Sequence, residues 1–221
     1  MKYIVVDLEM NGISKKSEAR EICKLETIEI GAVMLDDDLQ EISSFRTYVM
    51  PEFNDGIEKN ITALTGITDD MVMNAPNFNQ ALHLFTDWCL GAEDDLTIYA
   101  WSKTDFRQIS KEMSLKGYEV SERETGILLN SWSDFQREFD SYLGFEKQVS
   151  LKMALNMAGV DYSGQEHDAL DDARNTAELL QLFKDEELFD KTLRKIQDAM
   201  RPSTIGNTIG ELIDLSEFVC A

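Results

Sequence analysis

The fold predicted for this chain is decided by the stretch YIVVDLE at residues 3–9. The apolar, β-branched run of Ile4 to Val6 is typical of a buried strand, and the stretch ends in two acidic residues. Side chains alternate along a strand, so we expect Asp7 and Glu9 to share one face of the sheet. Neighbouring carboxylates that lose water are costly unless a cation neutralises them, and oxygen ligands favour Mg²⁺ or Mn²⁺. The alternative, which these two residues alone favour, is that the strand ends here with both acids in water.

Two more strand-like segments follow at residues 27–35 and 42–50, and an acidic turn of hairpin length separates them. We therefore expect an antiparallel meander. Helical spacing begins after Pro76, and a short strand is expected at residues 96–101. Further helices are expected at residues 105–116, 134–143, 151–158 and 168–182. This order predicts an α/β domain in which helices cover a sheet.

The composition limits the classes of protein that fit. The 221 residues include 21 Lys and Arg against 42 Asp and Glu, a formal net charge of −21, which disfavours a protein that grips a DNA duplex. Cys23, Cys89 and Cys220 are widely spaced and predict neither a disulfide framework nor a thiolate zinc site. With no signal-like start and no long apolar run, we expect a cytoplasmic protein without membrane contact. We expect one domain at residues 1–185 and a C-terminal helical extension and tail at residues 186–221.

Two further places hold candidate catalytic groups. His167 precedes a helical pattern that contains Asp172, and the two side chains converge only if His167 lies before the helix. A histidine there can act as a general base near neutral pH. Asp105 lies where a strand gives way to a helix, at a sheet edge where α/β proteins bind ligands. The alternatives are an acidic first helical turn with a surface histidine, and a helix cap at Asp105.

Together these acids resemble the DEDDh superfamily of 3′-to-5′ exonucleases, relatives of ribonuclease T and of the proofreading subunit of bacterial DNA polymerase III. The likeness extends over roughly residues 3–183 through linking motifs in the same order: TIEIGAV at 27–33, LTGIT at 64–68, APNF at 75–78 and HDALDDA at 167–173. The resemblance implies a ribonuclease H-like fold, with a mixed five-stranded sheet that begins with a three-stranded meander and is flanked by helices.

The resemblance also implies the roles of the site residues. Asp7, Glu9 and Asp172 would hold a first divalent ion, Mg²⁺ or Mn²⁺, and Asp7 and Asp105 a second one. Two such ions can stabilise the attacking and leaving oxygens together during displacement at phosphorus. His167 would deprotonate the attacking water, and a 5′-nucleoside monophosphate would leave from the 3′ end.

The middle motif AWSKTD at residues 100–105 looks like the form found in the ERI-like ribonuclease branch, with Ser102 in place of a glycine. Single-stranded RNA is therefore expected as the substrate ahead of DNA. By the same likeness Met10 and Leu64 would pack against the terminal base, with core packing as the alternative. Lys103 and Arg107 form the start of a basic helical stripe that could guide phosphates, or a solvated helix face. The residues predicted to contact substrate are thus Met10, Leu64, Trp101, Lys103 and Arg107.

A second hypothesis is an interaction protein that keeps the exonuclease fold without turnover, or works only with a partner, and docks that partner through the C-terminal extension. Retention of all five candidate groups, Asp7, Glu9, Asp105, His167 and Asp172, argues against it. Another kind of phosphotransfer enzyme lacks support because no Gly-rich phosphate loop is present.

Overall fold

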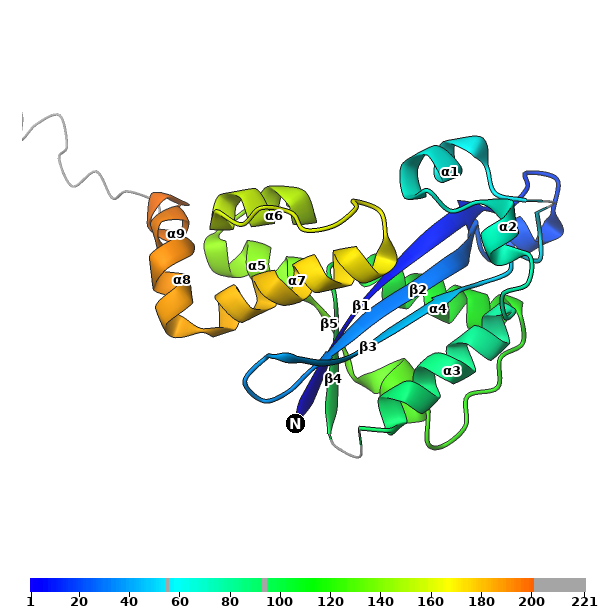
Figure 1. The fold of residues 1–221 in the computed structure, drawn as a ribbon, viewed down its shortest axis with the longest axis horizontal. Helices are drawn as coiled ribbons and strands as arrows, with labels where there is room; N and C mark the ends of the chain where they lie inside the picture. Colours follow the sequence, from blue (N-terminus) through cyan, green and yellow to red (C-terminus); the bar gives the residue numbers. More distant parts are fainter. Residues whose placement is uncertain (55, 93–94, 201–221) are drawn as a thin grey trace, which may run out of the picture.

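The computed structural model describes residues 1–54, 56–92 and 95–200, and its centre is a five-stranded sheet in the order β3-β2-β1-β4-β5 (Figure 1). Strands β1 (Lys2–Gly12), β2 (Leu25–Leu35) and β3 (Glu41–Tyr48) form an antiparallel meander, while β4 (Leu96–Ala100) and β5 (Trp132–Asp134) add parallel pairs beside β1. The predicted mixed sheet with its leading meander is confirmed.

Helices cover both faces of this sheet (Figure 1). Their bounds are α1 Lys59–Thr65, α2 Asp69–Val72, α3 Phe78–Leu90, α4 Lys103–Leu115, α5 Phe135–Leu143, α6 Leu151–Ala158, α7 Ala169–Lys184, α8 Glu186–Thr192 and α9 Arg194–Met200. A 3₁₀ turn at Glu18–Glu21 and a π-helical turn at Gly126–Asn130 complete the described elements. The helix expected after Pro76 begins at Phe78, because Asn77 forms a capping box with Gln80.

Successive side chains of β1 point to opposite faces of the sheet, and each face has its own hydrophobic core. Ile4 and Val6 are buried with residues of α3 and α4, whereas Val5 is buried with residues of α5, α6 and α7. Asp7 and Glu9 follow Val5 in this alternation and therefore face α7. The register with β2 shifts between Glu9 and Met10, after which the pairing continues to Gly12. The two acids thus lie within β1, which runs three residues beyond Glu9, and they face the start of α7.

The chain beyond α7 continues to pack on the same body. Phe189 of α8 and Leu193 are buried in one cluster with Phe139 of α5. The predicted boundary between residues 185 and 186 stays a prediction, and residues 201–221 of the predicted extension lie outside the described residues. Cys23 and Cys89 are free and buried, and Cys220 lies outside the described part. Among the described helices, none has the length and apolar character needed to cross a membrane.

Candidate active site

Strand β1 presents two acids to the start of α7. Glu9 is buried at 8% exposure, and Asp7 is partly buried one period of the pleat earlier. In the antiparallel register, Glu9 lies opposite Glu29 of β2. The interior of the domain therefore holds acidic side chains where water is scarce, which requires compensation by protons or cations.

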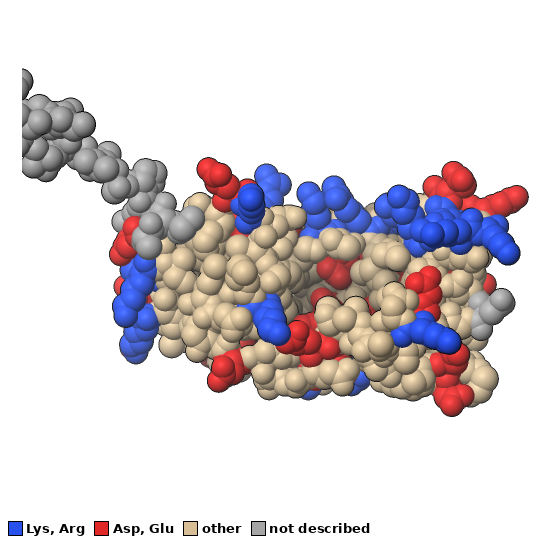
Figure 2. Space-filling model, turned by 90° about the horizontal axis from the view of Figure 1, so that it is seen from above, with Lys and Arg blue, Asp and Glu red and all other residues tan. Residues whose placement is uncertain are grey.

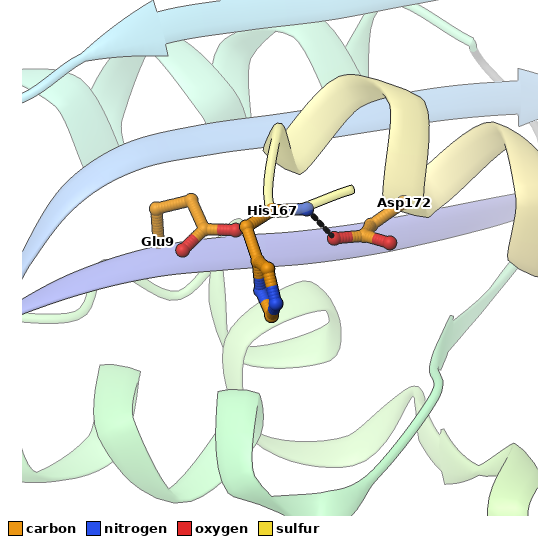
Figure 3. Close-up of side chains that lie close together, drawn as sticks. All are labelled: Glu9, His167 and Asp172. Carbon is orange, nitrogen blue, oxygen red and sulfur yellow. Dashed lines mark hydrogen bonds between the residues drawn. The ribbon is translucent and has the colours of Figure 1, made fainter. Parts of the chain in front are cut away.

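His167 lies before α7, as the spacing requires. Its φ of 63° puts the residue in the left-handed region, and Asp168 is the N-cap of the helix. This turn brings the His167 backbone N–H to Asp172 Oδ2 at 3.1 Å. The imidazole lies between Glu9 and Asp172, and the ligand-type atoms of the three residues are all within 4.8 Å of one another (Figure 3). The predicted convergence of His167 and Asp172 is confirmed.

Asp105 reaches the same place from the other side of the sheet. It lies in the first turn of α4 and is buried at 5% exposure. Ser102, which replaces the glycine of the ERI-like motif, is the N-cap of this helix and accepts a hydrogen bond from the Thr104 N–H at 3.1 Å. The serine therefore starts the helix that carries Asp105.

One cavity of about 440 Å³ joins all five predicted groups. It is a hollow with acidic side chains inside, and Lys and Arg side chains gather along one of its edges (Figure 2). Its lining includes Asp7, Glu9, Asp105, His167 and Asp172, together with Met10, Trp101, Ser150, Lys152, Tyr162 and Glu166. Within the described residues, the group with ligand atoms within 4.8 Å is Glu9, His167 and Asp172, while Asp7 and Asp105 line the same cavity outside it.

The carboxyls raise one another's pKa. Burial, and then the charges of Asp172, Glu29 and Asp105, raise the pKa of Glu9 to about 8. Burial raises the pKa of Asp105 to about 7 against backbone hydrogen bonds that lower it, and burial with the neighbouring acids raises the pKa of Asp7 well above its ordinary value. Burial also raises the pKa of Asp172, although bonds from Tyr162 and the His167 N–H oppose it. An all-carboxylate set with this mutual repulsion fits hard divalent cations.

The predicted substrate contacts divide into two groups. Met10 and Trp101 line the cavity, and Trp101 is buried against Phe135. Leu64 lies on α1 with 48% of its surface exposed, so it is neither in the core nor in the cavity lining. Lys103 and Arg107 are exposed on α4 outside that lining, and Lys103 borders a smaller neighbouring cavity.

Three features of the site were missed by sequence reasoning. The Tyr162 hydroxyl donates to Asp172 Oδ1 at 2.7 Å. Lys152 and Glu166, both at the cavity, form an ion pair of 2.5 Å. Arg46 of β3 pairs with Asp168 at 2.6 Å beside His167. Each pair joins residues ten or more positions apart in the sequence, and only the proximity of Tyr162 to the acidic HDALDD segment could have indicated one of them.

Comparison with known proteins identifies the family of the chain. The RNase_T exonuclease family model matches residues 4–180. The chain belongs to this exonuclease family. The predicted superfamily is thereby confirmed, and membership implies dependence on divalent metal ions, which the carboxylate cluster fits.

Several exonuclease relatives are similar over much of the chain. Human 3′-5′ exoribonuclease 1 is 30% identical over 163 residues, which cover 70% of this chain and 45% of the relative. ERI1 exoribonuclease 2 of Danio rerio is 27% identical, over 80% of this chain and 34% of the relative. The chain thus spans less than half the length of these curated relatives.

Solved exonuclease structures share the fold. The nuclease domain of 3′hExo, a DEDDh family member bound to rAMP, aligns with a TM-score of 0.72 at 23% identity, covering 84% of this chain and 92% of that one. E. coli exonuclease I in complex with a dT13 oligonucleotide aligns with a TM-score of 0.63 at 16% identity, covering 86% and 43%. The predicted ribonuclease H-like fold is confirmed.

Proposed function

We propose that this chain is a divalent-metal-dependent 3′-to-5′ exonuclease that removes 5′-nucleoside monophosphates from the ends of single-stranded RNA, and less readily of DNA. One observation carries the proposal: four carboxyls and a histidine from three separate parts of the chain line a single cavity. The pKa values of the four carboxyls are raised because they are buried close to one another, and a bound cation would offset their repulsion.

The carboxyls of Asp7, Glu9 and Asp172 would hold one ion, and those of Asp7 and Asp105 a second. Mg²⁺ and Mn²⁺ suit such oxygen ligands, and when bound they supply Lewis acidity to the oxygens that attack and leave phosphorus. Tyr162 and the His167 N–H each bond one oxygen of Asp172, at 2.7 and 3.1 Å, and so fix the orientation of that carboxyl.

The imidazole of His167 would act as the general base. It would accept a proton from water while the water oxygen forms a bond to phosphorus and the bond to the 3′ oxygen of the preceding nucleotide breaks. The position of the ring between Glu9 and Asp172 at the cavity supports this role. The left-handed backbone of His167, whose N–H bonds Asp172, presents the ring there.

One kind of observation supports RNA ahead of DNA, and a second supports a single-stranded nucleic acid of either kind. The curated relatives named above are exoribonucleases, and the AWSKTD motif has the form of their branch. Met10 and Trp101 offer apolar surface in the cavity to a terminal base of any identity. The basic edge in Figure 2 offers phosphates a local attraction that the net charge of −21 does not provide. Lys103 and Arg107 would belong to this attraction.

The test is a time course on 5′-labelled single-stranded RNA and DNA of one sequence, with Mg²⁺, Mn²⁺ or chelator. The wild-type protein should produce a ladder that shortens from the 3′ end and disappears with chelator. Asp172→Asn should abolish it, while Glu178→Gln, an exposed acid on the same helix, should not. The absence of cleavage by a folded, metal-supplied wild-type protein would favour the non-catalytic alternative. The cytoplasmic location stays a prediction.

A further inference from the structure

We propose that Arg46 is a positioning residue for the exonuclease reaction: by bridging Glu29 of β2 and Asp168 at the N-cap of α7, it holds the turn that presents His167. The inference rests on the proposed function, because the turn matters for turnover only if His167 takes part in it.

Arg46 spans two elements with one guanidinium group. Its Nε lies 2.6 Å from Glu29 Oε1, and its terminal nitrogen lies 2.6 Å from Asp168 Oδ2. The same nitrogen donates to the Tyr48 hydroxyl at 3.0 Å. A planar guanidinium with several fixed donors suits such a bridge, whereas a lysine ammonium cannot make both ionic contacts in the same geometry.

Glu29 is the buried partner of Arg46. Its side chain is fully buried in the middle of the sheet, and its second carboxylate oxygen accepts the Ala169 backbone N–H at 3.2 Å. The first residue of α7 is therefore tied to β2 directly, and Arg46 supplies the charge that the buried carboxylate needs. Without Arg46, Glu29 would leave an uncompensated charge across the strand pair from Glu9.

Asp168 is the partner of Arg46 that lies next to His167. One of its oxygens caps α7 by accepting the Asp171 N–H at 3.2 Å, and the other accepts from Arg46. Asp168 directly follows His167, whose backbone has a φ of 63°. A left-handed conformation of a non-glycine residue persists where surrounding contacts enforce it. Arg46 and the Glu29 contact to Ala169 are such contacts, placed immediately after the strained residue.

A second arginine pair shows what a purely structural bridge looks like in this fold. Arg174 of α7 pairs with Glu41 of β3 at 3.2 Å, so it also connects that helix and strand. It is one and a half turns beyond the N-terminus of the helix, and neither partner lines the cavity. Arg174→Met is therefore a matched control for Arg46→Met.

The experiment compares Arg46→Met, Arg46→Lys and Arg174→Met in the full chain. For Arg46→Met we expect kcat to fall about ten- to a hundredfold with KM within about threefold of wild type, because the base is displaced and the substrate surface is not. Arg46→Lys should recover part of kcat. Arg174→Met should keep both constants near wild type.

A second readout follows the turn itself. The chain has only two histidines, His83 and His167, so their imidazole NMR signals can be assigned by one substitution. In metal-free Arg46→Met at a fixed pH the His167 signal should shift and broaden while the His83 signal stays in place. An unchanged His167 signal in the folded variant would overturn the proposal, as would equal losses of kcat in Arg46→Met and Arg174→Met.

The proposal for Arg46 can still be tested if the wild-type protein is inactive or if the Arg46→Met variant does not fold. If the wild-type protein has no nuclease activity, the proposed function fails, and the His167 signal still decides whether Arg46 holds the turn. If Arg46→Met does not fold, the double variant Glu29→Gln with Arg46→Met removes the buried charge and keeps an acceptor for Ala169. The same loss of kcat and shift of the His167 signal are then expected, and their absence would overturn the proposal.

Discussion

Glu9 and Glu29 lie directly opposite each other on β1 and β2, but the two carboxyls have different electrostatic surroundings. Arg46 pairs with Glu29 at 2.6 Å and opposes the rise in pKa that burial causes there. At Glu9, burial and four neighbouring acids all raise the pKa, to about 8. One member of the pair thus has its cation within the fold, and the other fits a cation from solution.

The metal-free protein should lose stability as the pH rises. The folded protein keeps a proton on Glu9 up to a pKa of about 8, whereas the unfolded chain releases it near 4.5. The folded state therefore binds more protons in this window, and the free energy of unfolding falls with pH, by up to about 5 kcal/mol from this group.

Urea unfolding in chelator between pH 5 and pH 8 measures this loss. Glu9→Gln should reduce the pH dependence, of which Asp7, Asp105 and Asp172 keep a part because their pKa values are also raised. Glu178→Gln should leave it as in wild type, and added Mn²⁺ should stabilise the wild-type protein at pH 8. A slope for Glu9→Gln equal to that of wild type would contradict the assignment of the effect to this carboxyl.

Tyr162→Phe should weaken metal binding more than stability. The hydroxyl donates to Asp172 Oδ1 at 2.7 Å and so restricts the carboxyl to one orientation. Removing a hydrogen bond that orients a metal ligand typically costs 10- to 100-fold in metal affinity, so the Kd for Mn²⁺ should rise by about tenfold, with about 1 kcal/mol lost in unfolding. Titration of Mn²⁺ followed by electron paramagnetic resonance measures this, with Tyr142→Phe, an exposed tyrosine of α5, as the control. Equal affinities for the two variants would refute the orienting role.

Gly31→Ala should disturb the start of α7. A Cβ atom at this position would overlap the backbone of Ala169 and Leu170, so the helix that carries Asp172 can approach β2 only at a residue without a side chain. We expect a loss of about 1–3 kcal/mol in unfolding free energy together with a large loss of nuclease rate. Gly126→Ala, where a Cβ meets no atom within 4 Å, is the control. A Gly31→Ala protein with wild-type stability and rate would contradict this prediction, because it would show that α7 can shift away from β2 with no loss of stability or activity.

The sequence predicted the parts of the fold and site that depend on local pattern. Alternation in residues 3–9 placed Asp7 and Glu9 on one face, and the helix predicted at residues 151–158 has those bounds in α6. His167 was placed before its helix by spacing alone. These features follow from the periods of strands and helices, which a single segment reveals.

Other features depend on distant partners or on very short elements. Helices α1 and α2 and strand β5 have 7, 4 and 3 residues, too few for a period to emerge. The Arg46 bridge needs the β2–β3 register, in which Arg46 lies opposite Gly31 and diagonal to Glu29. Nothing in the local sequence around Arg46 specifies that register, so the bridge could be found only in the folded chain.

The basic residues of α4 provide the last prediction, on how an acidic protein holds a polyanion. Lys103 and Arg107 are exposed in the first turns of the helix that carries Asp105. Charge reversal of both should weaken single-stranded RNA binding and reduce the slope of log affinity against log salt by about 0.7 for each phosphate that the protein no longer neutralises.

A matched variant separates local attraction from net charge. Lys191→Glu with Arg194→Glu makes the same change in charge on α8 and α9, where both residues are already paired with acids. Binding measured over a salt series should then show a reduced slope for the α4 variant only. Equal weakening by both variants would mean that long-range repulsion governs affinity and that Lys103 and Arg107 belong to a solvated helix face. A reduced slope confined to the α4 variant would mean that a few local cations beside the cavity offset the repulsion of the whole protein.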